Sequence, residues 1–548
     1  DVTFGRPVRW LLALYGEATI PVEAAAITSG NSTEGHRVLG PGPWPVPKAE
    51  AYFEILEKHA KVILDPARRK REIMERGEAL ALGVKARVVW LDRLLEEVSG
   101  LVEYPRPVLG GFDPSFLELP REVLLTSMET HQKCFGLEDA DGRLVPYFLC
   151  TLNLDPRDTD LVRRGWERVL KARLEDARFF WRTDLAHELE TWRERLENVV
   201  FLGPLGSMGD KTRRLESLCR FLAGRVPGVD AEALAQAGGL AKADLVSEMV
   251  GEFAELQGIM GGVYARKKGL PEPVAQAIAE QYLPAGPESP VPASLPGALL
   301  AMADKLDTLA GCFGLEMIPT GAADPYALRR AALGVCRIIQ EHGLRLNLSA
   351  LCRAAIEGYG QRQWKLPVDE ALVRLREFFA QRLKSWFTGQ GFETLTVEAA
   401  VGAGSDDVRG LEARLRALDT FSREVDFGQA VLTFKRAGNI LRKQTGEPGK
   451  PGEPLDGAYQ AELFQEPAER ALAQALESVA GNFETLWAGD DYPALLNLLR
   501  ELRPFVDQFF DSVMVMCDDQ ALRRNRLNLL QALVSRLSRI ADFTALQV

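Results

Sequence analysis

The sequence predicts an α+β N-terminal region followed by a mostly α-helical, multidomain remainder. Three observations lead to this fold class. Strand-like and helix-like segments alternate over residues 1–150. From Trp166 onward, apolar residues recur at the three- and four-residue spacing of amphipathic helices. The chain of 548 residues is long enough for roughly three to four hydrophobic cores.

Composition and charge limit the class of protein. Hydrophobic residues make up 46% and charged residues 26%, as in ordinary soluble globular proteins. There is no run of 18 apolar residues, so no membrane span is expected. The net charge of -11 argues against a dedicated basic module for nucleic acids. Local basic patches remain compatible with it, because salt limits charge attraction to about 8–10 Å.

Cysteine usage indicates the compartment. The seven cysteines are scattered and form no CxxC pair, which is typical of reduced thiols in a cytoplasmic protein. The chain begins at Asp1 in the middle of a pattern and without an initiator Met, so we expect an N-terminal part to be absent.

Residues 1–150 are expected to form an α+β domain. The neighbouring segments VRWLLALYG and ATIPVEAAAI have strand composition, and Asp141-Gly142 lies between two apolar segments as a hairpin turn does. His36 and His131 fall in segments interpreted as loops. A lone loop histidine is most often a surface or hydrogen-bonding residue, although a role in a pocket stays open.

The next segment, WERVLKARLEDARFFW, predicts a long helix. One face carries the apolar residues Trp166, Leu170, Leu174, Ala177 and Trp181, and the other faces carry Arg168, Lys171, Arg173 and Arg178. We interpret the apolar face as core rather than as a platform for stacking bases. The basic side is interpreted as solvated.

Residues 242–266 predict one amphipathic helix with an apolar stripe that includes Leu245, Met249 and Phe253. Its other flank carries a row of carboxylates, Asp244, Glu248, Glu252 and Glu255. Such a row is unfavourable without a cationic partner, which could be a metal ion or a basic helix. A second acidic helix, ALLAMADKLDTLAGCFG, contributes Asp304 and Asp307.

Two acid-bearing helices also occur in metal-dependent phosphohydrolases of the HD type. An alternative function is therefore such a phosphohydrolase, using Asp244, Glu248 and Asp304. However, Lys242-Ala243-Asp244 occupies the place where a His-Asp pair would be needed. A lysine ammonium has no lone pair for a metal ion and repels it. We therefore expect Lys242, Asp244 and Asp304 to form a degenerate site without metal.

The segment VVFLGPLGSMGDKT resembles a phosphate-binding loop only superficially. Its glycines, Gly203 and Gly209, have the wrong spacing, and Asp210 precedes Lys211 where a phosphate would lie. We interpret the segment as a helix-capping turn with Asp210 near the positive end of the helix dipole.

Basic residues gather at three places in the C-terminal half, and each suits contact with phosphates. They are Arg330 and Arg337 on one predicted helix face, Lys435, Arg436, Asn439 and Arg442 in FKRAGNILRK, and Arg523, Arg524 and Arg526 at the start of the last helix. Cations at a helix start are unfavourable unless an anionic partner is present. The planar guanidinium of arginine, with its paired N–H donors, and the side-chain amide of asparagine are both suited to contacts with RNA. For Arg330 and Arg337, pairing with nearby carboxylates is an equally good explanation.

Eight segments together carry a family resemblance: HQKCFGL, LEDARFFWRTDL, LGSMGDKTRRLESL, KADLVSEMVGEFAELQGIMGGVYAR, ADKLDTLAGCFG, DPYALRRAALGVCRII, FKRAGNIL and FFDSVMVMCDDQALRRNRL. In this order and over nearly the whole chain, they resemble the bacterial glycyl-tRNA synthetase beta subunit. The family is longer at the N-terminus. Several long blocks in order are far more specific than any single motif.

The resemblance implies a noncatalytic tRNA-binding role. In that family a separate alpha subunit holds glycine and ATP with magnesium, the beta subunit recognises tRNA(Gly), and the two form an alpha/beta heterotetramer. No cofactor or catalytic residue is expected on this chain. A purely structural scaffold remains a further alternative.

The resemblance also implies a domain order. Residues 1–150 are similar to part of a B3/B4-type domain, for which we predict no editing chemistry, and residues 151–350 to a helical HD-like domain with degenerate ligands. Residues 351–404 form a helical linker, and residues 405–548 resemble the helical anticodon-binding domain shared with arginyl-tRNA synthetases. The RNA-contact candidates of that domain are Lys435, Arg436, Asn439, Arg523, Arg524 and Arg526.

Overall fold

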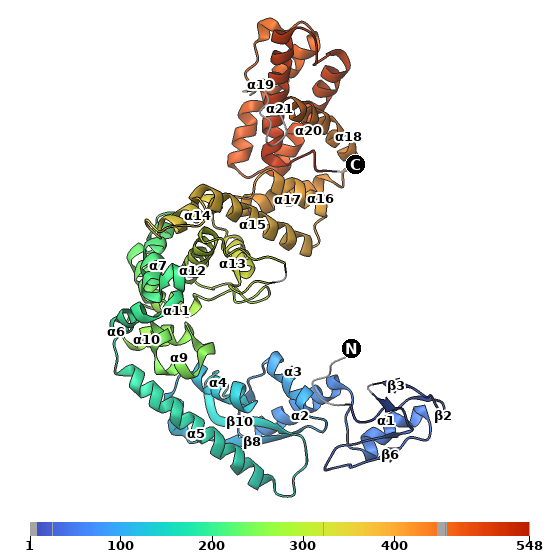
Figure 1. Ribbon diagram of the computed structural model, residues 1–548, viewed down its shortest axis with the longest axis vertical. Helices are drawn as coiled ribbons and strands as arrows, with labels where there is room; N and C mark the ends of the chain where they lie inside the picture. Colours follow the sequence, from blue (N-terminus) through green and yellow to red (C-terminus); the bar gives the residue numbers. More distant parts are fainter. Residues whose placement is uncertain (1–7, 25, 322, 446–454, 456, 547–548) are drawn as a thin grey trace. The chain divides into compact units, whose positions relative to one another are not determined.

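The computed structural model describes residues 8–24, 26–321, 323–445, 455 and 457–546 (Figure 1). The chain divides into two compact units. The first comprises Asp1–Glu188 and Leu245–Met260, and the second comprises Leu189–Asp244 and Gly261–Val548. Among the residues just given, no helix combines the length and the apolar character needed to cross a membrane.

The first unit begins with three small antiparallel ribbons. They pair β1 (Leu14–Tyr15) with β2 (Ala18–Thr19), β3 (Glu23–Ala24) with β4 (Ile27–Thr28), and β5 (Ser32–Thr33) with β6 (Trp44–Pro45). Short helical turns follow as η1 (Ala49–Ala51), α1 (Tyr52–Glu54) and η2 (Ile55–His59). His36 is buried here, and its Nδ1 accepts the N–H groups of Val38 and Leu39 at 3.2 and 3.0 Å. Its interpretation as a hydrogen-bonding histidine is confirmed.

A four-stranded antiparallel sheet forms the core of the first unit. Its strand order is β7 (Arg87–Val88), β9 (Phe135–Glu138), β10 (Leu144–Leu152) and β8 (Arg106–Gly111). Phe135 and Leu149 of the sheet pack with Ile73 of α2 (Pro66–Gly83) and Leu94 of α3 (Asp92–Leu101). Gly142 has a φ of 78° in the turn between β9 and β10, so the predicted hairpin is confirmed.

The helices that complete this unit are η3 (Pro114–Glu118), α4 (Arg121–Gln132) and α5 (Thr159–Leu185). The long helix α5 packs against β8 and α4 (Figure 1). Leu170, Leu174, Ala177 and Trp181 are buried along it. The predicted apolar face is therefore confirmed, because a stripe at helical spacing must be covered by the rest of the fold.

The prediction of one continuous helix over residues 242–266 is wrong. The segment is divided into η6 (Ala243–Val246), α9 (Glu248–Glu252), η7 (Ala254–Leu256) and α10 (Ile259–Lys267). Ser247 starts α9 in an extended conformation and accepts the N–H of Val250 at 3.2 Å. Gly258 has a φ of 80°, which a continuing helix does not allow.

This division separates the predicted row of carboxylates. Asp244 belongs to the second unit, whereas Glu248 and Glu252 belong to the first. Asp184 of α5 accepts the N–H groups of Glu248 and Met249 at 2.9 and 3.0 Å and so holds the start of α9. The Glu252 carboxylate lies 3.3 Å from Arg173 of α5. One basic residue of α5 therefore pairs with this acid.

The second unit begins with a helical domain built around α12 (Leu295–Gly314). Helices α7, α8, α11, α13, α14 and α15 all pack against it. The elements of this region are α6 (Leu189–Arg195), η4 (Leu196–Asn198), β11 (Val200–Leu202), η5 (Gly203–Leu205), β12 (Gly206–Ser207), α7 (Met208–Ala223), α8 (Ala231–Leu240), α11 (Glu272–Glu280), α13 (Leu328–Glu341), α14 (Leu348–Glu357) and α15 (Val368–Gly389). The predicted second acidic helix is confirmed, and it is the centre of its domain rather than an outer helix.

Helix α13 begins later than predicted. Aspartate followed by proline is typical of a helix cap and first residue, so the segment DPYALRRAALGVCRII predicts a helix from Pro325. The helix starts instead at Leu328 after Ala327, which has a φ of 55°. The Asp324 carboxylate nevertheless accepts the N–H groups of Leu328 and Arg329 at 2.8 and 3.0 Å. Asp324 therefore still caps the start of α13, although three residues lie between it and the first helical residue.

The described residues in the C-terminal part of the second unit form helices and their connections. This part contains α16 (Thr394–Gly402), α17 (Val408–Phe421), α18 (Phe427–Thr445), η8 (Ala461–Leu463), α19 (Pro467–Ala488), α20 (Tyr492–Ser512) and α21 (Gln520–Ile540). Helix α18 packs against α20 and α21. In α21 the apolar residues at helical spacing, which predict a buried stripe, include Leu530, Leu533 and Leu537, and all three are buried. The proline- and glycine-rich segment QTGEPGKPGEPLDG has the composition of a loop, and most of it lies outside the described residues. The predicted fold class, α+β and then mostly α, is confirmed.

Candidate nucleic-acid interface

One face of α18 carries a shallow groove of about 370 Å³. It is lined by residues at successive helical positions, namely Leu432, Lys435, Arg436, Asn439, Ile440 and Lys443. Arg436, Asn439 and Lys443 are exposed, and Leu432 is 59% exposed. Three cations, one amide and two aliphatic side chains therefore lie together at the surface.

Neighbouring parts of the chain contact two of the three cationic side chains of this groove. The guanidinium of Arg436 lies 4.4 Å from the ring centre of Phe510 on α20. The Nζ of Lys435 donates to the carbonyl of Leu546 at 3.0 Å. In the described part of the chain, the exposed Asn439 amide has no hydrogen-bond partner. Its donor and acceptor are therefore available to a ligand such as a base edge.

Arg442 does not line this groove. Its guanidinium donates to the hydroxyl of Thr544 and lies 3.8 Å from the Asp542 carboxylate. The sequence grouped Arg442 with Lys435, Arg436 and Asn439 because all four lie within eight residues. In the structure, however, Arg442 contacts the chain's C-terminal segment.

Arg526 is buried rather than exposed at the start of α21. Only 5% of it is exposed, and its Nε donates to the fully buried Glu469 at 2.8 Å. Its Nη1 donates to the carbonyl of Met514 at 2.9 Å. Burial would raise the pKa of Glu469, but the hydrogen bonds from Arg526 and from backbone N–H groups outweigh it and lower this pKa. Arg526 therefore joins α21 to α19 within the fold.

The two arginines before it are differently placed. Arg523 is half-buried and Arg524 is exposed, and neither has an acidic partner within the described ranges. Asp519 accepts the N–H groups of Ala521 and Leu522 at 2.9 and 3.1 Å. The helix start is thus capped by the chain itself, and the two arginines remain available to an external anion.

Arg330 and Arg337 also differ, although both lie on α13. Arg337 donates to the carbonyls of Gly286, Pro287 and Ser289 at 3.3, 2.7 and 2.8 Å, and pairs with Glu341 at 3.0 Å. It therefore holds the proline-rich segment before α12. Arg330 is exposed, without an ion-pair partner in the described parts of the chain.

The predicted degenerate site forms a buried cluster of lysines and aspartates around α12. Both Lys211 and Lys242 place Nζ 3.1 Å from Oδ1 of Asp304. Lys211 also lies 3.0 Å from the Asp307 carboxylate and 2.9 Å from the Thr308 hydroxyl. Burial would raise the pKa of Asp304, but the ammonium groups of Lys211, Lys242 and Lys305 outweigh it and hold this pKa well below its usual range.

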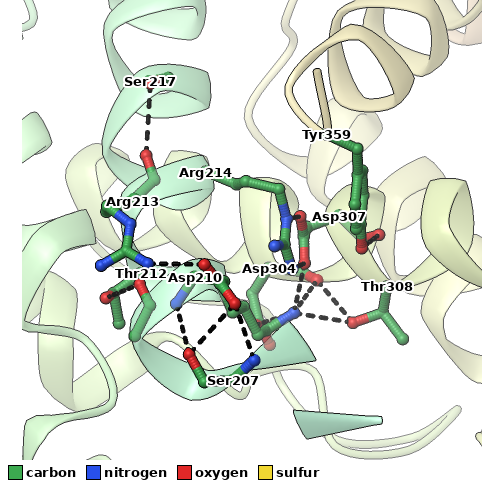
Figure 2. Close-up of polar contacts among 12 residues, drawn as sticks. Ser207, Asp210, Thr212, Arg213, Arg214, Ser217, Asp304, Asp307, Thr308 and Tyr359 are labelled. Atoms are coloured by element: carbon green, nitrogen blue, oxygen red, sulfur yellow. Dashed lines mark hydrogen bonds and ion pairs between the residues drawn. The ribbon is translucent and has the colours of Figure 1, made fainter. Parts of the chain in front are cut away.

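Arg214 completes this cluster (Figure 2). Its Nε and Nη2 donate to the two carboxylate oxygens of Asp307 at 2.6 and 3.2 Å. The same guanidinium lies 3.9 Å from the ring centre of Tyr359, whose hydroxyl donates to the backbone carbonyl of Asp307 at 2.9 Å. Asp307 is therefore paired on both oxygens, and α7, α12 and the residues after α14 are tied together.

The cluster does not fit a divalent metal ion. Two ammonium groups already occupy the surroundings of Asp304, and an added cation would meet their repulsion. Asp244, which is 0% exposed, accepts the N–H of Gly261 at 2.9 Å. Within the ranges that the structure describes, no three His, Cys, Asp or Glu side chains come together as metal ligands.

The turn before α7 confirms the capping interpretation. Ser207 and Asp210 form a reciprocal capping box, with Ser207 N–H to Asp210 at 2.9 Å and Asp210 N–H to Ser207 Oγ at 3.0 Å (Figure 2). Sequence reasoning did not find Lys211 and Arg214 as partners of the α12 aspartates. The spacing of the sequence contains a hint of this pairing. Lys211 and Arg214 each lie four residues before a buried leucine of α7, Leu215 and Leu218, so they share the buried face of that helix.

Comparison with known proteins agrees with the geometry. Residues 1–402 match the family model described as glycyl-tRNA synthetase beta subunit, and residues 431–543 match that of the DALR anticodon binding domain. Glycine–tRNA ligase beta subunits from Oleidesulfovibrio alaskensis and Moorella thermoacetica are 62% and 42% identical over 548 and 550 aligned residues. Each alignment covers 100% of this chain and 78% of the relative. The resemblance inferred from the sequence is thereby confirmed, and the chain belongs to the glycine–tRNA ligase beta subunit family.

Proposed function

We propose that this chain is the subunit that holds tRNA(Gly) while a separate alpha subunit attaches glycine. In this proposal ATP and magnesium are used at the alpha subunit, and the two subunits form an alpha/beta heterotetramer in the cytoplasm. Family membership supports the proposal. A phosphohydrolase function finds no support, because lysine ammonium groups surround Asp304 where that function needs a metal ion.

The α18 groove carries the proposal, because it falls inside the residues that match an anticodon-binding domain. We assign the anticodon arm to this groove. Arg436 and Lys443 would contact phosphates, and Asn439 would contact a base edge. Arg523 and Arg524 on α21, and Arg330 on α13, would add phosphate contacts. Lys435 stays among the proposed contacts because it lines the groove. Arg337, Arg442 and Arg526 are instead assigned to stabilising the fold.

The buried cluster around Asp304 is proposed as a structural centre. Ion pairs within it link α7 and the turn after α8 to α12 at the middle of the domain. We further propose the division into residues 1–150, 151–350, 351–404 and 405–548, with no editing chemistry in the first part. The end of the first family match at residue 402 supports the last boundary.

The chain would promote glycylation by orientation. A tRNA held at its anticodon arm reaches the alpha subunit in a restricted set of positions, which lowers the entropic cost of bringing its end to the activated glycine. No step of bond making is assigned to side chains of this chain. The proposal therefore predicts that beta-subunit variants act mainly on KM for tRNA.

A reconstitution experiment tests this proposal. Purified chain, purified alpha subunit and tRNA(Gly) are mixed with glycine, ATP and magnesium, and glycylation is measured with each component omitted in turn. Glycyl-tRNA should form only when both subunits are present. Glycylation by this chain without the alpha subunit would contradict the division of roles, and full activity of the alpha subunit alone would contradict the requirement for this chain.

A further inference from the structure

A groove of about 670 Å³ lies beside α5 in the first unit, at a site to which the proposed function assigns nothing. Its lining combines residues after β8, residues at the start of β10 and one side of α5. The residues used below are Phe112, Asp113, Tyr147, Glu167, Arg168 and Lys171. The groove is therefore formed by the rigid sheet and its longest covering helix.

The helical side of this groove contributes two cations, Arg168 and Lys171, beside Glu167. Arg164, Arg168 and Lys171 follow each other at four- and three-residue spacing, so they share one face of α5 over about 10 Å. All three are exposed. None has an ion-pair partner in the ranges that the structure covers.

Every other basic residue that continues this row forms an ion pair with an acidic residue. Arg178 pairs with Glu175, and Arg182 lies 2.8 Å from Glu118. Arg163, on the neighbouring face, pairs with Asp160 at 3.1 Å. The basic residues on either side are thus paired with acids, whereas three adjacent cations of α5 beside the groove form no ion pair in the described residues.

The acids of the groove itself are already engaged. Glu167 accepts the N–H of Gly111 at 3.0 Å and so joins α5 to the end of β8. Asp113 accepts the N–H of Ser115 at 2.8 Å, and this bond lowers the pKa of Asp113, with smaller contributions from Arg178 and Lys171. Neither carboxylate forms an ion pair with Arg168 or Lys171 among the described residues. The groove lining therefore holds two cations and two carboxylates, and with Arg164 on the same helix face the surface carries one net positive charge in a chain whose net charge is -11.

We infer that this groove, which we call the α5 groove, binds the sugar–phosphate backbone of the tRNA outside its anticodon arm. The inference rests on the proposed function and adds a second contact surface to it. Arginine and lysine in a row without ion pairs, beside the aromatic rings of Phe112 and Tyr147, are a pattern found in nucleic-acid grooves. Protein–protein interfaces, in contrast, are depleted in lysine and in charge at their centres.

The test uses two fragments of the tRNA with the complete complex of this chain and the alpha subunit. One is a minihelix containing the acceptor and T arms, and the other is the anticodon stem-loop. The variant Arg168→Glu/Lys171→Glu should weaken minihelix binding at least tenfold and leave stem-loop binding within twofold. Removing two phosphate contacts should also reduce the salt slope of minihelix binding by about 1.8, at about 0.9 per contact.

A matched control is available within the same unit. Arg71 on α2 and Arg93 on α3 are exposed and lie outside the groove, so Arg71→Glu/Arg93→Glu changes the net charge equally. This control should bind the minihelix as the unchanged complex does. Equal loss in both variants would mean a general charge effect and would overturn the inference.

Two further outcomes separate the inference from its alternatives. If the groove variant binds the minihelix normally, the inference is wrong, while the proposed function stands provided that Arg436→Glu still weakens stem-loop binding. If the groove variant instead fails to associate with the alpha subunit in size-exclusion chromatography, the groove is a protein interface and the inference is again overturned. Circular dichroism of each variant checks that the fold is retained.

Discussion

The Nζ atom of Lys242 lies 3.1 Å from Oδ1 of Asp304, with Lys242 2% exposed and the Asp304 side chain 14% exposed. A second ammonium, from Lys211, reaches the same oxygen at the same distance. Buried charges are tolerated only when they are paired, because removing a charge from water costs several kcal/mol. Its pairing with Asp304 explains how Lys242 can be buried two residues before Asp244 without disrupting the helical domain.

Replacing Lys242 by Met should destabilise the chain by about 2–3 kcal/mol, slightly less than the ~3–5 kcal/mol typical of breaking a buried pair, because Lys211 still answers Asp304. Urea-induced unfolding at neutral pH measures this change. Lys267→Met is the control, since Lys267 is exposed on α10, and it should stay within about 0.5 kcal/mol. A Lys242→Met chain as stable as the control would show that the pair contributes nothing.

The stability of the chain should depend on Lys305 in alkaline solution. Burial lowers the pKa of Lys305 to about 8, whereas the unfolded chain has its ordinary value of 10.5. Between these pH values the unfolded state binds more protons, so the contribution of Lys305 to the free energy of unfolding rises as pH increases. The difference between the unchanged chain and Lys305→Met should therefore grow in favour of the unchanged chain from pH 8 to pH 10.

Because cysteines and tyrosines titrate in the same range, only the difference between the two proteins is informative. Thermal unfolding of both, followed at pH 7.5, 8.5 and 9.5, gives that difference. A constant difference across the series would mean that Lys305 keeps its ordinary pKa in the folded chain.

Arg526 and Arg524 should behave differently although they are two residues apart. Arg526→Met leaves the buried Glu469 unpaired and should destabilise the second unit by about 3 kcal/mol. At temperatures where the Arg526→Met chain is folded, its tRNA affinity should depend on salt concentration as that of the unchanged chain does. Arg524→Glu should leave stability within about 0.5 kcal/mol but weaken tRNA binding and reduce the salt slope by about 1.

Unfolding by urea and tRNA binding at three salt concentrations distinguish the two arginines. The assignment would be reversed if Arg526→Met reduced the salt slope while keeping full stability. Arg523→Glu, tested in the same way, should resemble Arg524→Glu.

Long periodic segments were predictable from the sequence because their apolar stripes must be covered. Helices α5, α12 and α21 all appear at the expected residues with the expected buried faces. The segment over residues 242–266 has a comparable stripe, yet Ser247 and Gly258 divide it. Periodicity reports which residues are buried but does not distinguish one helix from several short turns that bury the same residues in different directions.

The candidate site was predictable only in part. Arg436 and Asn439 line the α18 groove, as a helical face allows. Arg526 was grouped with its exposed neighbours, although it lies four residues after Leu522 and four before Leu530, inside the buried stripe of α21. Its partner Glu469 is more than fifty residues away, so nothing local in the sequence identifies the pair. Long-range pairing of this kind depends on the tertiary fold.

Binding of the anticodon stem-loop of tRNA(Gly) to Arg436→Glu/Asn439→Ala tests the central claim most directly. The measurement compares this variant with Arg376→Glu, an exposed control on α15, in the complex with the alpha subunit. The account predicts that the groove variant loses at least tenfold in affinity and about 1 in salt slope, while the control binds normally. Unchanged stem-loop binding by a folded groove variant would contradict the account.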